Sequence, residues 1–278
     1  MFDPLLPLVG ALPSADWPDL AGYESLRIAS GQAPVSGSCA ALRFVAQPAK
    51  KPKAFEQRYE PRIYLTGEVP TRLGNWHDLF NALVWLTFPR AKAEINRRHY
   101  LEIERATASA RRGAVRDALT LFDESGVIVA CGDEDLAGLL RGFQWKQLFW
   151  DRRQAVQQRM RFYLFGHGLY EKALSPFIGL TGNAVILPVA DSFFAASLVA
   201  QLQEMDVSLA RWLSTAENLA PRSWMPLPLL GVPGWTRENE SGDFYDNDRY
   251  FRGGRNRRAQ GEGKAGAAGE ETYSIRHL

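Results

Sequence analysis

The chain has little of what marks several familiar classes of protein. Its two cysteines, Cys39 and Cys131, form neither a disulfide framework nor a CxxC pair, so a reducing compartment is expected. No apolar run approaches the roughly 18 residues of a membrane span. The apolar N-terminus lacks the basic start of a signal peptide. The sequence therefore predicts a soluble, cytoplasmic protein with no membrane association.

Several motifs with known chemistry are missing, and so is an excess of charge of one sign. The motifs GxxxxGK[ST], GxSxG and HExxH are absent, and the one GxGxxG string, GEGKAG, lies in the Gly-rich C-terminal tail and does not follow a predicted strand, which argues against the dinucleotide-binding, P-loop, serine-hydrolase and zincin classes. The formal net charge is +2. Residues 249–278 carry a net +4, so the rest of the chain carries −2. A nearly neutral body argues against a protein that binds nucleic acid over a broad basic surface.

Helical periodicity dominates the rest of the chain. We expect helices over residues 17–30, 76–88, 91–110, 114–122, 167–175, 191–214 and most of 134–165. Strands are expected at LRFV and VIVAC, an extended piece at YEPRIYLT, a turn at DESG and no regular structure over the proline-rich residues 221–235. The prediction is a mainly α fold with a minor β element (α+β). It comprises one compact globular domain over residues 1–251 and a Gly/Arg-rich tail over 252–278, which we expect to be disordered.

Two consecutive predicted helices carry polar side chains among apolar neighbours. At about 100° per residue, one face of the 76–88 helix holds His77, Asp78, Asn81 and Trp85. Asn96 and His99 share a face of the next helix. Because buried polar groups must be hydrogen-bonded or bound to a ligand, these faces form either a structural network or a site.

Two further clusters carry residues of the same kind. His167 and Glu171 lie four residues apart, a spacing at which both can ligate one metal ion. Several polar residues precede the buried strand VIVAC: Arg116, Asp117, Thr120, Asp123 and Glu124. Carboxylates at the end of a strand are common as catalytic or Mg²⁺-binding groups. The alternatives are a structural hydrogen bond for the first cluster and an ordinary turn for residues 123–126.

The strings that carry these clusters resemble a known family. The quoted stretches are YEPRIYLTGEVPTRLGNWHDLFNALVWLTFPRAKAEINRRH, RDALTLFDESGVIVA, GHGLYEKALSPFIGLTG, PLPLLGVPGW and FYDNDRYFR. They resemble a bacterial family catalogued only as domain of unknown function 3025, over roughly residues 15–252. The resemblance implies a bacterial cytoplasmic protein whose motifs are these four clusters, and it brings no activity, cofactor or fold with it.

The first functional hypothesis is a metal-assisted hydrolase or transferase acting on a phosphate-bearing or otherwise anionic substrate. A divalent ion is expected on His77, His99 and His167, with Glu171 or Asp78 as the carboxylate ligand. The catalytic carboxylates are expected to be Asp123, Glu124 and Asp78, with Asp123 or Glu124 as general base. Substrate contacts are expected from Arg72, Asn81, Trp85, Asn96, Arg112 and Arg116, since planar guanidinium groups suit paired oxygens.

Two other hypotheses stay open at this point. In one, the protein is a non-catalytic adaptor whose polar faces are buried networks, and residues 221–235 with the tail dock a protein or RNA. In the other, the arginine-rich face of residues 90–116 binds RNA; such a face is more often a solvated surface. The enzyme hypothesis requires that the separated clusters meet around one cavity.

Overall fold

Helix predominates over strand in the structure, a computed structural model that describes residues 1–12, 16–50, 53–106, 113–219 and 223–254. The prediction of a mainly helical fold with a minor β element is therefore confirmed. Among the described helices, none combines the length and the apolar character needed to span a membrane. The predicted disorder concerns a tail that, from residue 255 onward, lies outside the described part of the chain.

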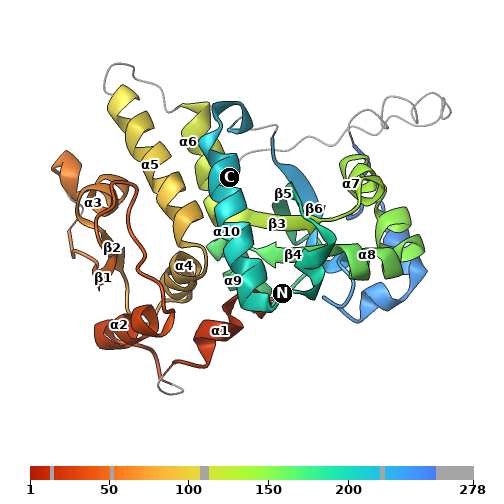
Figure 1. The fold of residues 1–278 in the computed structure, drawn as a ribbon, viewed down its shortest axis with the longest axis horizontal. Coiled ribbons are helices and arrows are strands. Elements are labelled where there is room, and N and C mark those ends of the chain that lie inside the picture. Colours follow the sequence, from red (N-terminus) through yellow and green to blue (C-terminus); the bar gives the residue numbers. More distant parts are fainter. Residues whose placement is uncertain (13–15, 51–52, 107–112, 220–222, 255–278) are drawn as a thin grey trace, which may run out of the picture.

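A four-stranded sheet lies at the centre of the molecule, in the order β4-β3-β5-β6 (Figure 1). Its strands are β3 (Gly126–Cys131), β4 (Met160–Leu164), β5 (Thr181–Pro188) and β6 (Met225–Pro228). β3 pairs in parallel with β5, while β4 and β6 are antiparallel to their neighbours. All six residues of β3 are buried, as expected of a continuously apolar strand covered on both faces.

Five helices pack beside this sheet and supply most of the candidate site. They are α4 (Trp76–Thr87), α5 (Pro89–Ala106), α6 (Ala114–Ser125), α9 (His167–Ala173) and α10 (Leu198–Ser214). Asn75 caps α4 by accepting the backbone N–H of Asp78, as its residue type predicts. Asp206 of α10 accepts the backbone N–H groups of Arg90 and Ala91. The first turn of α5 is therefore held by a carboxylate from a neighbouring helix.

A smaller unit packs on the other side of α5, at the left in Figure 1. It consists of α2 (Leu20–Ala29), the parallel strands β1 (Arg43–Ala46) and β2 (Glu68–Thr71), and α3 (Tyr59–Thr66). α3 ends at Gly67, which has a φ of +70°. A Cβ at this glycine would lie 2.1 Å from the carbonyl oxygen of Ala41, so the turn into β2 requires glycine.

The remaining elements are short. They are η1 (Asp3–Leu5), α1 (Leu6–Val9), η2 (Phe55–Gln57), α7 (Glu134–Arg141), a π-helix η3 (Gln147–Asp151), α8 (Arg153–Arg159) and the 3₁₀ turns η4 (Asp191–Ala195), η5 (Ala216–Asn218), η6 (Leu229–Gly231), η7 (Glu238–Glu240) and η8 (Gly242–Asp246).

Several local predictions are wrong. Residues 59–66 form helix α3 and no extended piece, and they pack on α5. The predicted turn at residues 123–126 does not exist, because α6 continues to Ser125 and β3 begins at Gly126. Residues 160–164 belong to strand β4, since they pair with β3, and residues 225–228 form the edge strand β6. Each error concerns a segment whose conformation is decided by a distant partner.

Candidate metal site

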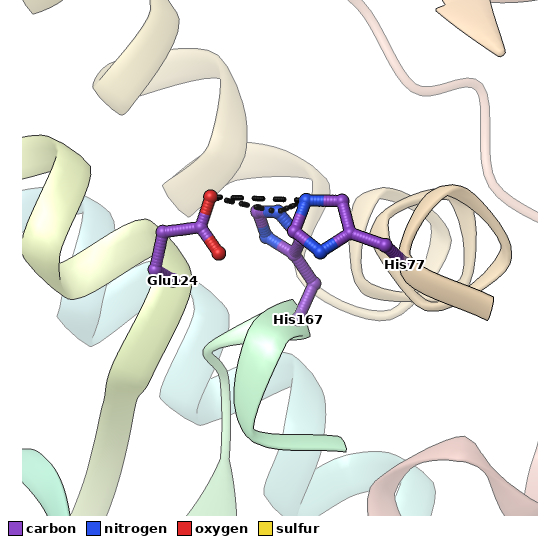
Figure 2. A group of neighbouring side chains, drawn as sticks. All are labelled: His77, Glu124 and His167. Atoms are coloured by element: carbon purple, nitrogen blue, oxygen red, sulfur yellow. Dashed lines mark hydrogen bonds and ion pairs between the residues drawn. The ribbon is translucent and has the colours of Figure 1, made fainter. Parts of the chain in front are cut away.

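Three helix ends meet beside the central sheet and bring together side chains from distant parts of the sequence (Figure 2). His77 is in the first turn of α4, Glu124 in the last turn of α6, and His167 is the first residue of α9. The Nε2 atoms of His77 and His167 are 3.1 Å apart. Oε1 of Glu124 lies 3.8 Å from the first and 3.5 Å from the second. Three potential ligand atoms therefore surround one point.

The glycines on either side of His167 make this approach possible. A Cβ at Gly166 would lie 2.4 Å from the backbone nitrogen of Ser125, and one at Gly168 would lie 2.7 Å from Oε2 of Glu124. Only glycine permits such close contact. The two glycines therefore allow α9 to begin directly against the end of α6, which places His167 beside Glu124.

The ligand distances suit a small divalent ion. Zinc in a tetrahedral site lies about 2.0–2.1 Å from nitrogen or oxygen ligands, which places two ligand atoms about 3.3 Å from each other. The observed separations of 3.1, 3.5 and 3.8 Å fall around this value. The three ligand atoms are therefore spaced for one small divalent ion.

Each of the two imidazoles has a carboxylate on its outer side. Nδ1 of His77 is 3.2 Å from Oε2 of Glu171. Nδ1 of His167 is buried without a hydrogen-bond partner, and the nearest carboxylate oxygen is Oδ2 of Asp123 at 3.9 Å. When Nδ1–H of His77 donates to Glu171, the Nε2 lone pair faces the cluster, as in many metal-binding histidines. Glu171 thus contacts His77 of another helix, although the spacing suggested a pairing with His167.

A chain of hydrogen bonds leads from Asp123 away from the cluster. Nζ of Lys92 donates to Oδ1 of Asp123 at 2.6 Å and to Oδ1 of Asn81 at 2.9 Å. Because lysine only donates, the amide oxygen of Asn81 faces it, and the amide nitrogen donates to the Tyr59 hydroxyl at 2.8 Å. Tyr59 is therefore an acceptor in this chain, and its own proton is left for another partner.

The carboxylates of the cluster are held in their ionised form. Burial by itself raises the pKa of Asp123, but the ammonium of Lys92 and the imidazole of His167 bring the pKa below its usual value. Burial is the largest single influence on the pKa of Glu124 and raises it, but the hydrogen bond with His167 and the interactions with His167 and His77 together bring the pKa below its usual value. Tyr59 is 42% exposed as a residue, but its hydroxyl lies against Asn81 at the cavity. There burial and nearby carboxylates raise the pKa of the phenol well above its usual value, so this group keeps its proton.

These groups line a cavity of about 370 Å³. Its described walls carry four carboxylates, from Glu60, Asp78, Asp123 and Glu124, and one cationic side chain, from Arg72. Lys92 is not a wall residue, but its ammonium pairs with Asp123. Together with the ammonium of Lys92, the walls therefore have a formal charge of −2 with the histidines neutral. A divalent cation neutralises this charge, so the cavity favours a cation over a free anion.

The other candidate residues on this side of the molecule have defined partners. The guanidinium of Arg72 contacts both oxygens of Asp78, at 2.8 and 3.0 Å, and its backbone N–H donates to Asp78 at 2.7 Å. Burial raises the pKa of Asp78, yet the bonds from Arg72 bring it below the usual value. His99 lines the cavity but is not one of the three clustered ligands. The structure thus places Arg72, Asp78 and His99 beside the cluster and not within it.

The remaining candidates lie farther from the three ligands. Asn96 donates to the backbone and side-chain oxygens of Glu60 and accepts from Gly37, which ties α5 to α3. The buried ring of Trp85 lies 5.2 Å from Nζ of Lys92. Arg116 has a buried Nε without a hydrogen-bond partner and is not among the described cavity walls. Arg112 lies outside the described residues.

The arginine-rich face of α5 is largely neutralised by its own glutamates. Arg97 and Arg98 both contact Glu94, and Arg105 contacts Glu102, at spacings of three or four residues. Such intrahelical pairs are typical of a solvated helix surface. They leave fewer free cations for a polyanion than the sequence suggested.

Lys92 and Tyr59 are the site residues that the sequence analysis missed. Lys92 shares a helix face with Asn96 and His99, at positions i, i+4 and i+7. Helix periodicity therefore places Lys92 on the same side as these two polar residues, which is a signal that the sequence contains. Tyr59 gave no comparable signal, because the segment that carries it did not look helical.

The fold and this cluster define a mainly helical α+β protein with a candidate two-histidine, one-carboxylate metal site. A family model described as a protein of unknown function (DUF3025) matches residues 42–255, more than three quarters of the chain. The chain belongs to this family, and the matched span contains all three clustered ligands. Neither the curated proteins nor the solved structures that were searched contain a match.

Proposed function

We propose that the chain is a metal-dependent hydrolase or transferase whose divalent ion is held by His77, Glu124 and His167. The observation that carries the proposal is the convergence of two imidazole nitrogens and one carboxylate oxygen within 3.1–3.8 Å. Two histidines and one glutamate are the protein ligands of several zinc hydrolases, and they leave room for water and substrate. Such an ion lowers the pKa of a bound water to about 7 and polarises the bond under attack.

The chain supplies the groups that move protons around this ion. Asp123 is the general base that takes a proton from the attacking water, and Lys92 keeps it ionised and fixed at 2.6 Å. Tyr59 is the proton or hydrogen-bond donor to the substrate, since its hydroxyl accepts from Asn81 and keeps its own proton. Both residues line the same cavity as the three ligands.

The charges of the cavity restrict the substrate. Lys92 and Arg72 are already paired with Asp123 and Asp78, so a substrate anion is attracted chiefly by the ion. This arrangement favours a substrate that presents one phosphate or carboxylate group to the ion and disfavours a polyanion such as RNA. The volume of about 370 Å³ is that of a small-molecule site.

Metal titration tests the ligand set directly. Chelator-treated full-length protein is titrated calorimetrically with Zn²⁺ and with Mn²⁺, and one site per chain is expected. His77→Ala, His167→Ala and Glu124→Gln are expected to abolish tight binding. His99→Gln is the matched control, because it changes a histidine of the same cavity outside the cluster and is expected to keep the site. A wild-type chain that binds neither ion supports the buried-network alternative instead.

Turnover is tested on p-nitrophenyl phosphate and p-nitrophenyl acetate with the metal-loaded protein. Asp123→Asn and Tyr59→Phe are expected to lower kcat by about 10²–10⁴-fold, as for lost acid–base groups, while zinc affinity is retained. Zinc binding without metal-dependent cleavage of either ester argues for a binding domain and against a hydrolase.

A further inference from the structure

A second and larger cavity, of about 870 Å³, lies between the end of α7 and the edge strand β6. Four aromatic rings contribute to its described walls: Phe143, Trp145, Trp224 and Tyr250. Pro226 and Pro228 of β6 add further apolar surface. Trp224, Pro226 and Pro228, from the proline-rich segment expected to have no regular structure, thus contribute one wall of a cavity.

The charge of this cavity is opposite to that of the metal cavity. Its described walls include Arg249 and Arg252 and no acidic residue. Both arginines are exposed, and within the described chain neither makes an ion pair with a carboxylate. By contrast, Arg72 is paired with Asp78. Two unneutralised guanidinium groups beside aromatic rings attract an anion and can stack on a planar one.

Phe143 occupies a backbone position that normally belongs to glycine. It has a φ of +55° and follows the end of α7. Its N–H donates to the carbonyl of Leu140, and the N–H of Gln144 donates to that of Leu139, a helix end that usually places glycine at this residue. The left-handed conformation is unfavourable for a residue that carries a Cβ. The chain accepts this strain at a residue whose ring lines the cavity.

The two indoles of the cavity differ in their hydrogen bonding. Nε1 of Trp145 donates to the backbone oxygen of Arg252 at 2.8 Å, which fixes the arginine-bearing segment against the rings. Nε1 of Trp224 is buried and has no hydrogen-bond partner. A buried donor without a partner is uncommon in proteins, and this one belongs to a residue of the cavity wall.

We propose that this cavity binds a small, planar aromatic anion. Its rings contact the flat part of the ligand, and Arg249 and Arg252 contact the negative group. The volume falls within the range of small-molecule sites. The proposal does not depend on the metal site, which belongs to a separate cavity.

The test uses two probes of this chemistry, 1-anilinonaphthalene-8-sulfonate and adenosine 5′-monophosphate, with the full-length protein. Binding is followed by probe fluorescence for the first and by quenching of tryptophan fluorescence for the second. Arg249→Gln and Arg252→Gln are each expected to weaken binding of at least one probe about tenfold, as for the loss of a charge-assisted contact. Arg211→Gln, which changes an exposed arginine of α10, is the matched control and is expected to bind as the wild type does.

Phe143→Gly provides an independent variant. It removes one ring of the cavity and also relieves the left-handed backbone, so the fold is expected to persist while probe binding is lost. Adenosine has the planar ring but no negative group, and inorganic phosphate has the negative group but no ring. Each is expected to bind more weakly than the nucleotide. The proposal is overturned if neither probe binds, or if the two arginine variants bind both probes as tightly as Arg211→Gln.

Discussion

Replacing Lys92 by methionine tests how the metal cavity is held together. The ammonium is 3% exposed and lies 2.6 Å from a carboxylate of Asp123 that is 16% exposed. It also donates to Asn81 at 2.9 Å. Methionine has nearly the same volume and no charge. The change therefore leaves the packing intact and deprives Asp123 and Asn81 of their shared donor.

The expected cost follows from the carboxylate that is left behind. Two unit charges 2.6 Å apart attract each other by about 6 kcal/mol at an effective dielectric constant of 20. Desolvation of the pair offsets much of this attraction. Removing one partner of a buried pair costs about 3–5 kcal/mol, because the other charge stays buried. We expect Lys92→Met to lower the free energy of unfolding by that amount, a large part of the total for a typical protein.

The measurement is guanidinium unfolding followed by tryptophan fluorescence, with Lys92→Met, Asp123→Leu and the double variant compared. The double variant is expected to cost less than either single change, because it leaves no unpaired charge. A loss below about 1 kcal/mol for Lys92→Met, or a double variant whose cost equals the sum of the single costs, would refute the reasoning. Either result would mean that the pair is solvated and not buried.

Three further outcomes are expected. Zinc at about 100 times its Kd stabilises the folded state by about 2.7 kcal/mol. For a chain of this size, that raises the Tm by about 5–11 °C. Scanning calorimetry should show this rise for the wild type and no such rise for His77→Ala. Burial raises the folded-state pKa of Asp206 to about 6 from an ordinary 3.8. The folded state therefore holds the Asp206 proton more tightly than the unfolded state does. The free energy of unfolding is highest below pH 4 and falls by about 3 kcal/mol as the pH rises through 6. Urea unfolding of Asp206→Asn should lack this decline, and an unchanged pH profile would count against a raised pKa. Gly67→Ala places a Cβ 2.1 Å from a backbone oxygen at a φ of +70° and should cost about 2 kcal/mol or more, whereas Gly10→Ala, with open space around it, should leave the unfolding midpoint unchanged.

Local sequence patterns predicted the helices that carry His77, Lys92 and His167. Apolar periodicity located α4, and the position of His77 and Asn81 on that helix follows from it. The buried strand β3 was evident from its unbroken apolar run. These features depend on neighbours within a few residues, so a single sequence contains enough information to find them.

The partners of these residues were not predictable in the same way. Glu171 was expected beside His167 because the two are four residues apart, yet it contacts His77, which is 94 residues away in the sequence. Asp78 was a candidate catalytic carboxylate, but Arg72 binds both of its oxygens. Such choices depend on which helices touch and at what angle, and a periodic pattern does not record either.

The sequence by itself determined which residue types each helix would present. These are an imidazole on each of α4 and α9, carboxylates at the end of α6, and a lysine on the same face of α5 as an asparagine and a histidine. Only the tertiary structure decided that His77, Glu124 and His167 share one point and that His99 stays outside it. The reason is physical. Helix periodicity is set by backbone hydrogen bonds within a few residues, whereas the meeting of three helix ends is set by long-range packing around β3 and by two glycines that let α9 contact the end of α6.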